Sequence, residues 1–200
     1  IIVGVFATLV ATVLGTLAAL GLNRAEYPGK SAIMAVLISP IIVPIVITAA
    51  GMFYFYAFIG LTGTLAGLVF AHATIGVPFV VITVSATLAG FDNNLVRAGA
   101  SLGADPVKVF FKVTLPLIMP AVLVAIVFRA LDALRVFDIV YVLTPNNANT
   151  ATMSVFAREN LFDFDRFAYG SAASTLLFLI IALLTIGFIR ATRMNLGGDR

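Results

Sequence analysis

Five apolar stretches, each long enough to cross a bilayer, constrain this 200-residue chain more than any other feature. The hydrocarbon core of a bilayer is about 30 Å thick, so a spanning helix needs about 20 consecutive residues with few charges. We expect spans near residues 1–22, 32–58, 64–88, 119–143 and 169–190. The composition agrees, because 62% of residues are hydrophobic, 10% are charged and the mean hydropathy is +1.13. The sequence predicts an all-α fold, a polytopic transmembrane helical bundle of about five spans.

The basic residues fall mainly in alternate connections between these spans. Three segments, the loop after the first span, the segment after the third and the tail, hold eight of the twelve: Arg24, Lys30, Arg97, Lys108, Lys112, Arg190, Arg193 and Arg200. The opposite side holds the turn 59–61 and an outer segment, about 144–168, whose two arginines are offset by acidic residues. Cytoplasmic loops carry an excess of Lys and Arg. The pattern therefore predicts an N-terminus outside and a C-terminus in the cytoplasm.

Two of the expected spans contain helix-breaking residues. Pro40 and Pro44 interrupt the second span, and Gly76 with Pro78 interrupts the third. Proline removes a backbone donor and crowds the preceding turn, which bends helices. Two interpretations stay open: the bends shape the bundle, or an unwound turn lines a polar pathway.

The residue inventory argues against chemistry carried out by this chain. Without Cys there is no thiol nucleophile and no Cys-ligated zinc. His72 is the single histidine, and without neighbouring His or carboxylate partners we interpret it as a hydrogen-bonded helix residue, not a metal ligand. We therefore expect no catalytic residue, no bound metal and no cofactor. A membrane enzyme lacks its catalytic groups here, whereas an ATPase-independent channel remains open from composition alone.

The segment of about 90–118, between the third and fourth spans, is unusually polar for this chain. Asp92 or Asn93 can cap a short helix that Gly103 ends. Asp105 and Pro106 then supply an N-cap and a first-turn proline for a second helix. That helix carries an apolar ridge flanked by Lys108 and Lys112, and we expect prolines to stop it before the fourth span: the ridge is Val107, Phe110 and Phe111, and the stops are Pro116 and Pro120. Such a ridge fits a groove in a partner protein or lies flat on lipid headgroups.

This segment resembles the EAA loop of permease subunits in binding-protein-dependent ABC importers. The family pattern is Glu-Ala-Ala, three residues, Gly, nine residues, Ile, one residue, Leu-Pro. The chain supplies Arg97, Ala98, Gly99, Gly103, Val113, Leu115 and Pro116 at those spacings. It departs from the pattern at Arg97, where the family usually has Glu, and at Gly99, where it has Ala.

The resemblance implies one transmembrane permease domain over residues 1–200, of the type I importer fold, lacking an N-terminal portion. It implies a bacterial cytoplasmic membrane location and a coupling helix that docks on separate ATPase subunits, which bind the ATP and Mg. The other partners implied are a second permease subunit, an extracytoplasmic solute-binding protein and membrane lipid, with no nucleic acid. Stretches up to about residue 120 resemble polyamine-type permeases, and the later FRALDALRVFDIVYVLTPNN resembles carbohydrate-type permeases.

The expected fourth span carries a charge at every third position: Arg129, Asp132, Arg135 and Asp138. Each charge facing lipid costs about 2.5–3.5 kcal/mol on insertion scales, so these groups face the bundle interior, water or one another. They either pair as Arg129 with Asp132 and Arg135 with Asp138 to lock the helices, or line the substrate pathway. For the pathway we favour Asp132 and Arg135, followed by Arg129 and Phe128. The outer segment, about 144–168, is a candidate docking surface for the binding protein, with a re-entrant or purely structural loop as alternatives.

Overall fold

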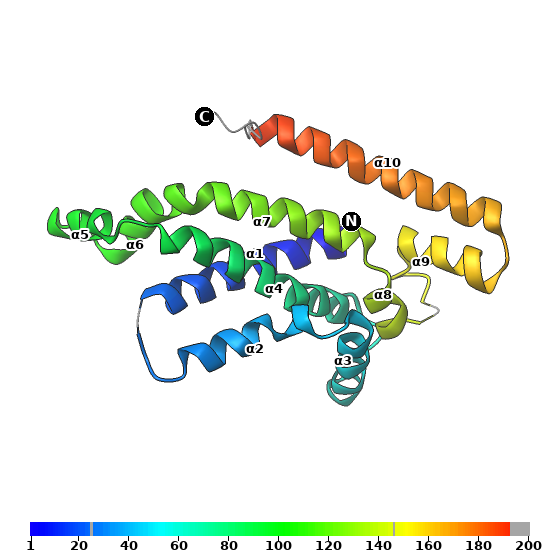
Figure 1. The fold of residues 1–200 in the computed structure, drawn as a ribbon. Coiled ribbons are helices and arrows are strands. Elements are labelled where there is room, and N and C mark those ends of the chain that lie inside the picture. Colours follow the sequence, from blue (N-terminus) through cyan, green and yellow to red (C-terminus); the bar gives the residue numbers. More distant parts are fainter. Residues whose placement is uncertain (25, 146, 193–200) are drawn as a thin grey trace.

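The computed structural model describes residues 1–24, 26–145 and 147–192, and every regular element within them is a helix (Figure 1). The α-helices are α1 (Ile2–Arg24), α2 (Lys30–Ile42), α3 (Ile45–Ile59), α4 (Leu65–Ala89), α5 (Asn93–Ser101), α6 (Pro106–Val109), α7 (Leu115–Arg135), α8 (Asp138–Leu143), α9 (Met153–Arg158) and α10 (Phe167–Thr192). Two π-helical segments are η1 (Phe110–Thr114) and η2 (Glu159–Asp163). The predicted all-α bundle is confirmed.

Four helices in the described part of the chain are long and apolar enough to cross a membrane: α1, α4, the continuous run from α6 through α7, and α10. A fifth span exists only if α2 and α3 count as one, because they are bent by 109° where they meet. The bend lies at Pro44, and Val43 before it is extended, as the residue preceding a proline tends to be. Pro40 stays inside α2. The predicted interruption of the second span is therefore confirmed at Pro44.

The core forms where α1, α4 and α7 pack side by side. One buried cluster joins these three helices: Ala19, Val80, Val84, Ile118, Val122 and Ala125. Small residues let α1 approach α4, since a Cβ added to Gly15 would lie 2.6 Å from the Cβ of Val80. Helix α10 packs mainly on α9 and η2 and otherwise stands apart from the other long helices (Figure 1). Most of its large apolar side chains are exposed. An apolar helix with this exposure suits contact with lipid or another apolar surface.

The third span is not interrupted, contrary to the sequence prediction. Helix α4 runs without a break through Gly76 and Pro78. The ring of Pro78 is fully buried, and α4 packs against both α1 and α7. Packing against neighbouring helices compensates for the one backbone hydrogen bond that proline removes. Gly76 has a different role, described with the site below.

Pro116 and Pro120 do not separate the coupling helix from the fourth span, which also corrects the prediction. In η1 the backbone widens by one residue, and the N–H of Leu115 donates to the carbonyl of Phe110, five positions earlier. This wider turn relieves the clash between a proline ring and the carbonyl four residues before it. Pro116 is therefore accommodated at the start of α7, and α6, η1 and α7 form one continuous run.

The fourth span ends earlier than predicted. Helix α7 stops at Arg135, and Val136 is extended before α8 begins at Asp138. Val136 and Phe137 pack against the buried cluster that contains Ile139 and Leu143, so tertiary packing turns the chain there. The expected single helix over 119–143 is therefore two helices.

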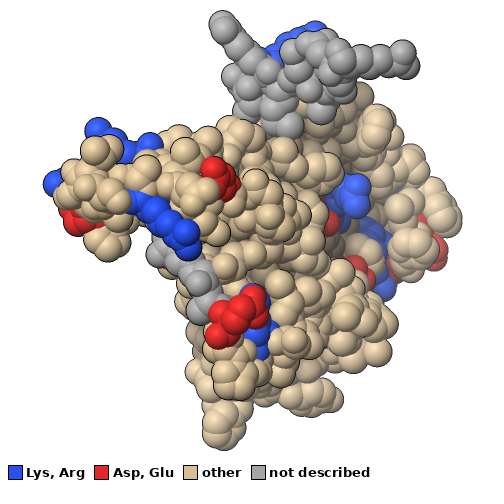
Figure 2. All heavy atoms as spheres, turned by 60° about the vertical axis from the view of Figure 1, so that its left-hand side comes forward, with Lys and Arg blue, Asp and Glu red and all other residues tan. Residues whose placement is uncertain are grey.

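Charged side chains gather at the two ends of the long helices. Figure 2 shows one group of charged residues on the projecting α5–α6 end and around the loop before α2, and a second group at the right of the view. The surface between these two groups is nearly uncharged. The α5–α6 end carries Lys30, Arg97, Lys108 and Lys112. Arg190 lies in the last turn of α10. Arg193 and Arg200 lie outside the described residues.

Candidate functional site

Two short helices, α5 and α6, make up the segment predicted to be the coupling segment, and they have the local geometry that the sequence predicts. Asp92 caps α5, its Oδ1 accepting from the N–H of Asn94 at 2.9 Å. Asp105 caps α6 in the same way, accepting from the N–H of Lys108 at 2.9 Å, and Pro106 follows in the first turn. Gly103 has φ of 80°, a left-handed conformation that glycine adopts without strain, and it turns the chain between the helices.

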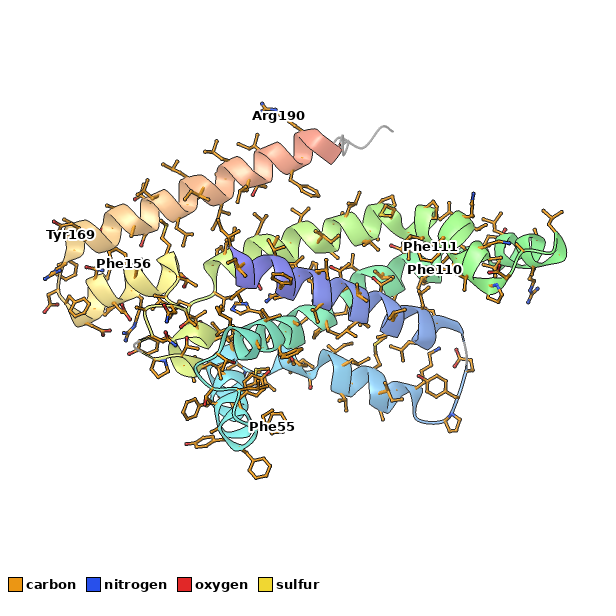
Figure 3. The ribbon with its side chains drawn as sticks, turned by 180° about the vertical axis from the view of Figure 1, so that it is seen from behind. Phe55, Phe110, Phe111, Phe156, Tyr169 and Arg190 are labelled. Carbon is orange, nitrogen blue, oxygen red and sulfur yellow. The ribbon has the colours of Figure 1, made fainter. Side chains whose placement is uncertain are left out.

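The apolar ridge of the coupling segment is exposed along only part of its predicted length. Val107 is 64% exposed and Phe111 is 59% exposed, while Phe110 is half-buried and stacks edge-on against Phe111 at 5.0 Å. Leu102, at the end of α5, is 88% exposed and is a third large apolar side chain exposed in this segment. Figure 3 shows the two phenylalanines at the end of the bundle opposite Tyr169. We call Leu102, Val107 and Phe111 the coupling ridge from here on.

The glycine at position 99 has a packing role in this chain. Val109 is buried, and a Cβ added to Gly99 would lie 3.2 Å from its Cγ2, closer than side chains normally approach. The small residue therefore lets α5 settle onto α6. The other motif positions differ in exposure: Arg97, Ala98 and Pro116 are exposed, and Val113 and Leu115 are half-buried. The side chain of Arg97 makes no ion pair within the described residues, so its charge is free to meet a partner.

A second feature is a stripe of exposed side chains near the C-terminal end of α7. Phe128, Asp132 and Arg135 are spaced four and three residues apart, which places them on one helix face. The side chain of Asp132 is 45% exposed, and Phe128 packs its ring 5.6 Å from that of Phe79 on α4. We call these three residues the α7 stripe. Because charges facing hydrocarbon are costly, this face is suited to water or to another protein.

Arg129 lies beside Asp132 on α7, on the side that faces α4, and is 3% exposed. Its Nη2 donates to the carbonyl oxygen of His72 on α4 at 2.7 Å and approaches His72 Nδ1 at 3.1 Å. A guanidinium only donates, so Nδ1 accepts. The Nη1 donates to Asp132 at 2.5 Å. These contacts support the interpretation of His72 as a hydrogen-bonded helix residue, and they make Arg129 a buried link between α7 and α4.

Gly76 makes this link possible. A Cβ at Gly76 would lie 2.7 Å from both Cδ and Nε of Arg129, and 2.9 Å from the Cβ of Ala11. Only glycine leaves room for the arginine side chain to pass along α4. The sequence pattern at Gly76 predicts a bend, because Arg129, the residue that needs the space, lies 53 positions away along the chain. The sequence did offer one signal: an arginine inside an apolar span has to be buried against a neighbouring helix, and a glycine on that helix can make room for it.

The second predicted charge pair does not form. Arg135 ends α7 and Asp138 begins α8, so the two residues no longer share a helix face. Neither makes an ion pair within the described part of the chain. The break leaves Arg135 exposed and places Asp138, half-buried, at the N-terminus of α8.

Comparisons with known proteins agree with this architecture. The sequence profile described as "Binding-protein-dependent transport system inner membrane component" matches residues 11–194. The chain is 32% identical over 205 residues to the trehalose/maltose transport system permease protein MalF of Thermococcus litoralis, covering 92% of this chain and 69% of that protein. It is 41% identical over 113 residues to the trehalose transport system permease protein SugA of Mycobacterium tuberculosis, covering 56% of this chain and 37% of that protein.

Polyamine permeases are also similar. The spermidine/putrescine transport system permease protein PotC of Escherichia coli is 35% identical over 118 residues, covering 59% of this chain and 45% of that protein. Among solved structures, a chain of the bacterial alginate ABC transporter, in complex with alginate pentasaccharide-bound periplasmic protein, superposes with a TM-score of 0.78 at 18% identity. That superposition covers 96% of this chain and 75% of the transporter chain. Because the family profile matches residues 11–194 of its 200 residues, the chain belongs to the inner membrane components of binding-protein-dependent transport systems.

Proposed function

We propose that this chain is the permease subunit of an ATP-driven ABC importer for a carbohydrate. Its spans form the substrate path across the bacterial cytoplasmic membrane, and a separate subunit hydrolyses the ATP. The observation that carries the proposal is the coupling ridge, an exposed apolar surface on a rigid, doubly capped helix pair at the basic end of the bundle. An apolar ridge with a charged rim is typical of a surface that inserts into a protein groove.

The geometry of α6 suggests how an ATPase would move this chain. Because α6, η1 and α7 are continuous, a displacement at Val107 passes directly into the helix that carries the α7 stripe. Closure of two ATPase subunits around ATP would pull the coupling ridge and tilt α7, opening the path to the outside. Hydrolysis would return the inward-facing state. The mechanism is alternating access, driven from the cytoplasmic end.

The α7 stripe supports a neutral cargo over a cationic one. Asp132 is paired with Arg129, and Arg135 adds a positive charge on the same face, so the carboxylate is not available as an isolated counter-ion for an amine. Asp and Arg side chains together accept from and donate to vicinal hydroxyl groups. The exposed ring of Phe128 offers a surface for the apolar face of a sugar ring. The stripe therefore fits a polyol.

The partners follow from this role. A second permease subunit, identical or homologous, would face the α7 stripe and complete the substrate path. A solute-binding protein would deliver cargo at the outer end, where exposed aromatic side chains on and after α9 make a docking surface: Phe156, Phe162, Phe164 and Phe167. This orientation places the C-terminus in the cytoplasm, consistent with the basic residues at the α5–α6 end.

A reconstituted complex tests the proposal. The permease subunits and ATPase are placed in lipid nanodiscs, and ATP hydrolysis is measured with the binding protein and trehalose, maltose or putrescine. We expect a sugar to stimulate hydrolysis and putrescine to leave it at the basal rate. Stimulation by putrescine alone would favour the polyamine alternative, which the similarity to PotC supports. Ion conductance without any ATPase would favour a channel.

A further inference from the structure

A cavity of about 450 Å³ opens at the outer end of the chain, apart from the α7 stripe and the coupling ridge. It lies where α8, the loop after it, α9 and η2 meet, which Figure 1 shows at the end of the bundle opposite α5. Its walls include Tyr141 from α8, Glu159 and Asp163 from η2, and Phe164. Pockets for small molecules commonly have volumes of this order.

The loop that forms one wall is held in place by hydrogen bonds. The Nδ2 of Asn147 donates to the carbonyl of Gly63 at 3.1 Å, and its Oδ1 accepts from the N–H of Asn149 at 3.0 Å. The N–H of Gly63 in turn donates to the carbonyl of Leu143 at 3.1 Å. The wall is therefore tied at two points to the turn before α4. A site preorganised in this way loses little entropy when a ligand binds.

The polar groups at the cavity leave one acidic charge unpaired. Arg158 forms an ion pair with one oxygen of Asp163, and its guanidinium lies over the ring of Tyr141, 4.2 Å from the centroid. The carboxylate of Glu159 makes no ion pair and no side-chain hydrogen bond within the described residues. The walls therefore offer one free carboxylate, one already neutralised carboxylate and a phenol hydroxyl. The ring of Phe164 is 58% exposed beside them.

We propose that this cavity is an outer carbohydrate site, which holds one sugar unit before the cargo reaches the α7 stripe. The inference rests on the proposed function, because it places the cavity on the side from which cargo enters. Sugar hydroxyls donate to carboxylates and exchange hydrogen bonds with a phenol, and the C–H face of a sugar packs on an aromatic ring. A cationic amine would find a single unpaired carboxylate in the wall, that of Glu159, because Asp163 is already paired with Arg158.

Cysteine protection tests the site in the complex of permease and ATPase subunits, in the cell membrane. The chain has no cysteine, so Ala148→Cys, an exposed position in the cavity wall, gives this chain a single reactive thiol. Energy-depleted cells that express the transporter without its binding protein are treated with a membrane-impermeant thiol reagent, and labelling of this chain is followed by its gel shift. Ala168→Cys is the control, because Ala168 is exposed but does not line the cavity.

We expect trehalose, at three times its dissociation constant, to slow labelling of A148C about fourfold, as simple occupancy requires. Labelling of A168C should not change, putrescine should protect neither position, and adding Glu159→Gln should weaken the protection while unprotected labelling continues at its usual rate. The proposal is overturned if trehalose and maltose leave A148C labelling unchanged, if both positions slow equally, or if putrescine protects instead. Sugar-stimulated ATP hydrolysis without protection would leave the proposed function standing and refute the outer site alone.

Discussion

The guanidinium of Arg129 on α7 donates a hydrogen bond of 2.7 Å to the main-chain carbonyl of His72 on α4. This link crosses the core between two spans and also fixes Asp132 through a second hydrogen bond. The side chain of Arg129 is therefore buried while it holds the carboxylate of Asp132 in the α7 stripe. The charge pattern that suggested a pathway along one helix separates into a buried link and an exposed stripe.

Replacing Arg129 should destabilise the bundle more than replacing its partner. Arg129→Lys cannot bridge a carbonyl and a carboxylate in the same fork, and hydrogen bonds to charged groups contribute about 1.5–3 kcal/mol each. We expect Arg129→Lys to lower the thermal unfolding midpoint of the purified complex clearly, and Asp132→Asn, whose side chain is nearly half exposed, to lower it much less. Equal midpoints for the two variants would contradict the buried link.

The space at Gly76 gives a second prediction. Gly76→Ala would place a Cβ 2.7 Å from Arg129, so the arginine has to move and the unfolding midpoint should fall. The matched control is Gly51→Ala in α3, where a Cβ meets nothing within 4 Å. Alanine is a better helix former than glycine by about 0.5–1 kcal/mol, so the control should be neutral or stabilising. If Gly76→Ala behaves like the control, the arginine does not need this space.

Changes at the coupling ridge should separate docking from folding. Phe111→Asp puts a charge on the exposed ridge, and we expect it to reduce ATPase retention at least about tenfold, a loss of about 1.4 kcal/mol, while membrane insertion persists. Phe110→Asp introduces a charge at a half-buried position, so it should also reduce the amount of folded protein. The comparison is made by co-purification in mild detergent.

Phe162→Asp serves as the control for that experiment, because Phe162 is 73% exposed at the opposite end of the chain. It should keep the ATPase bound at the usual level. Coupled transport by the Phe111→Asp variant at the normal rate would show that the ridge is not the contact.

Substitutions in the α7 stripe should change which sugar the transporter prefers. Asp132→Asn keeps size and Arg135→Gln keeps a polar side chain while each removes a charge, and both side chains are accessible, so assembly with the ATPase should persist. We expect each to change the relative stimulation of ATP hydrolysis by trehalose and maltose, with the larger effect at Asp132. Loss of membrane insertion without any change of preference would instead assign these residues to packing.

Local rules explain which parts of this fold were predictable from the sequence. Asp92, Asp105 and Gly103 act through bonds to near neighbours, so the helix pair of the coupling segment could be placed correctly. The bend at Pro44 has the same origin.

The remaining features depend on residues far apart in the chain. The Arg129–His72 link joins positions 57 residues apart, and the end of α7 at Arg135 follows from packing of Val136 and Phe137 against other helices. The predicted helix stop at Pro116 was wrong because a π-helical turn accommodates this proline, and no local sequence pattern predicts that turn. The cavity beside α8 likewise has a wall held by a long-range contact, since Asn147 bonds to Gly63, 84 positions away.

The most direct test of the account is a photo-crosslinking amino acid placed at position 107, in the exposed part of the coupling ridge. The complete transporter is irradiated in its native membrane, and the adducts of this chain are identified by mass spectrometry. The account predicts a dominant adduct with the ATPase subunit. Adducts only with lipid, or none with any protein in an assembled complex, would contradict it.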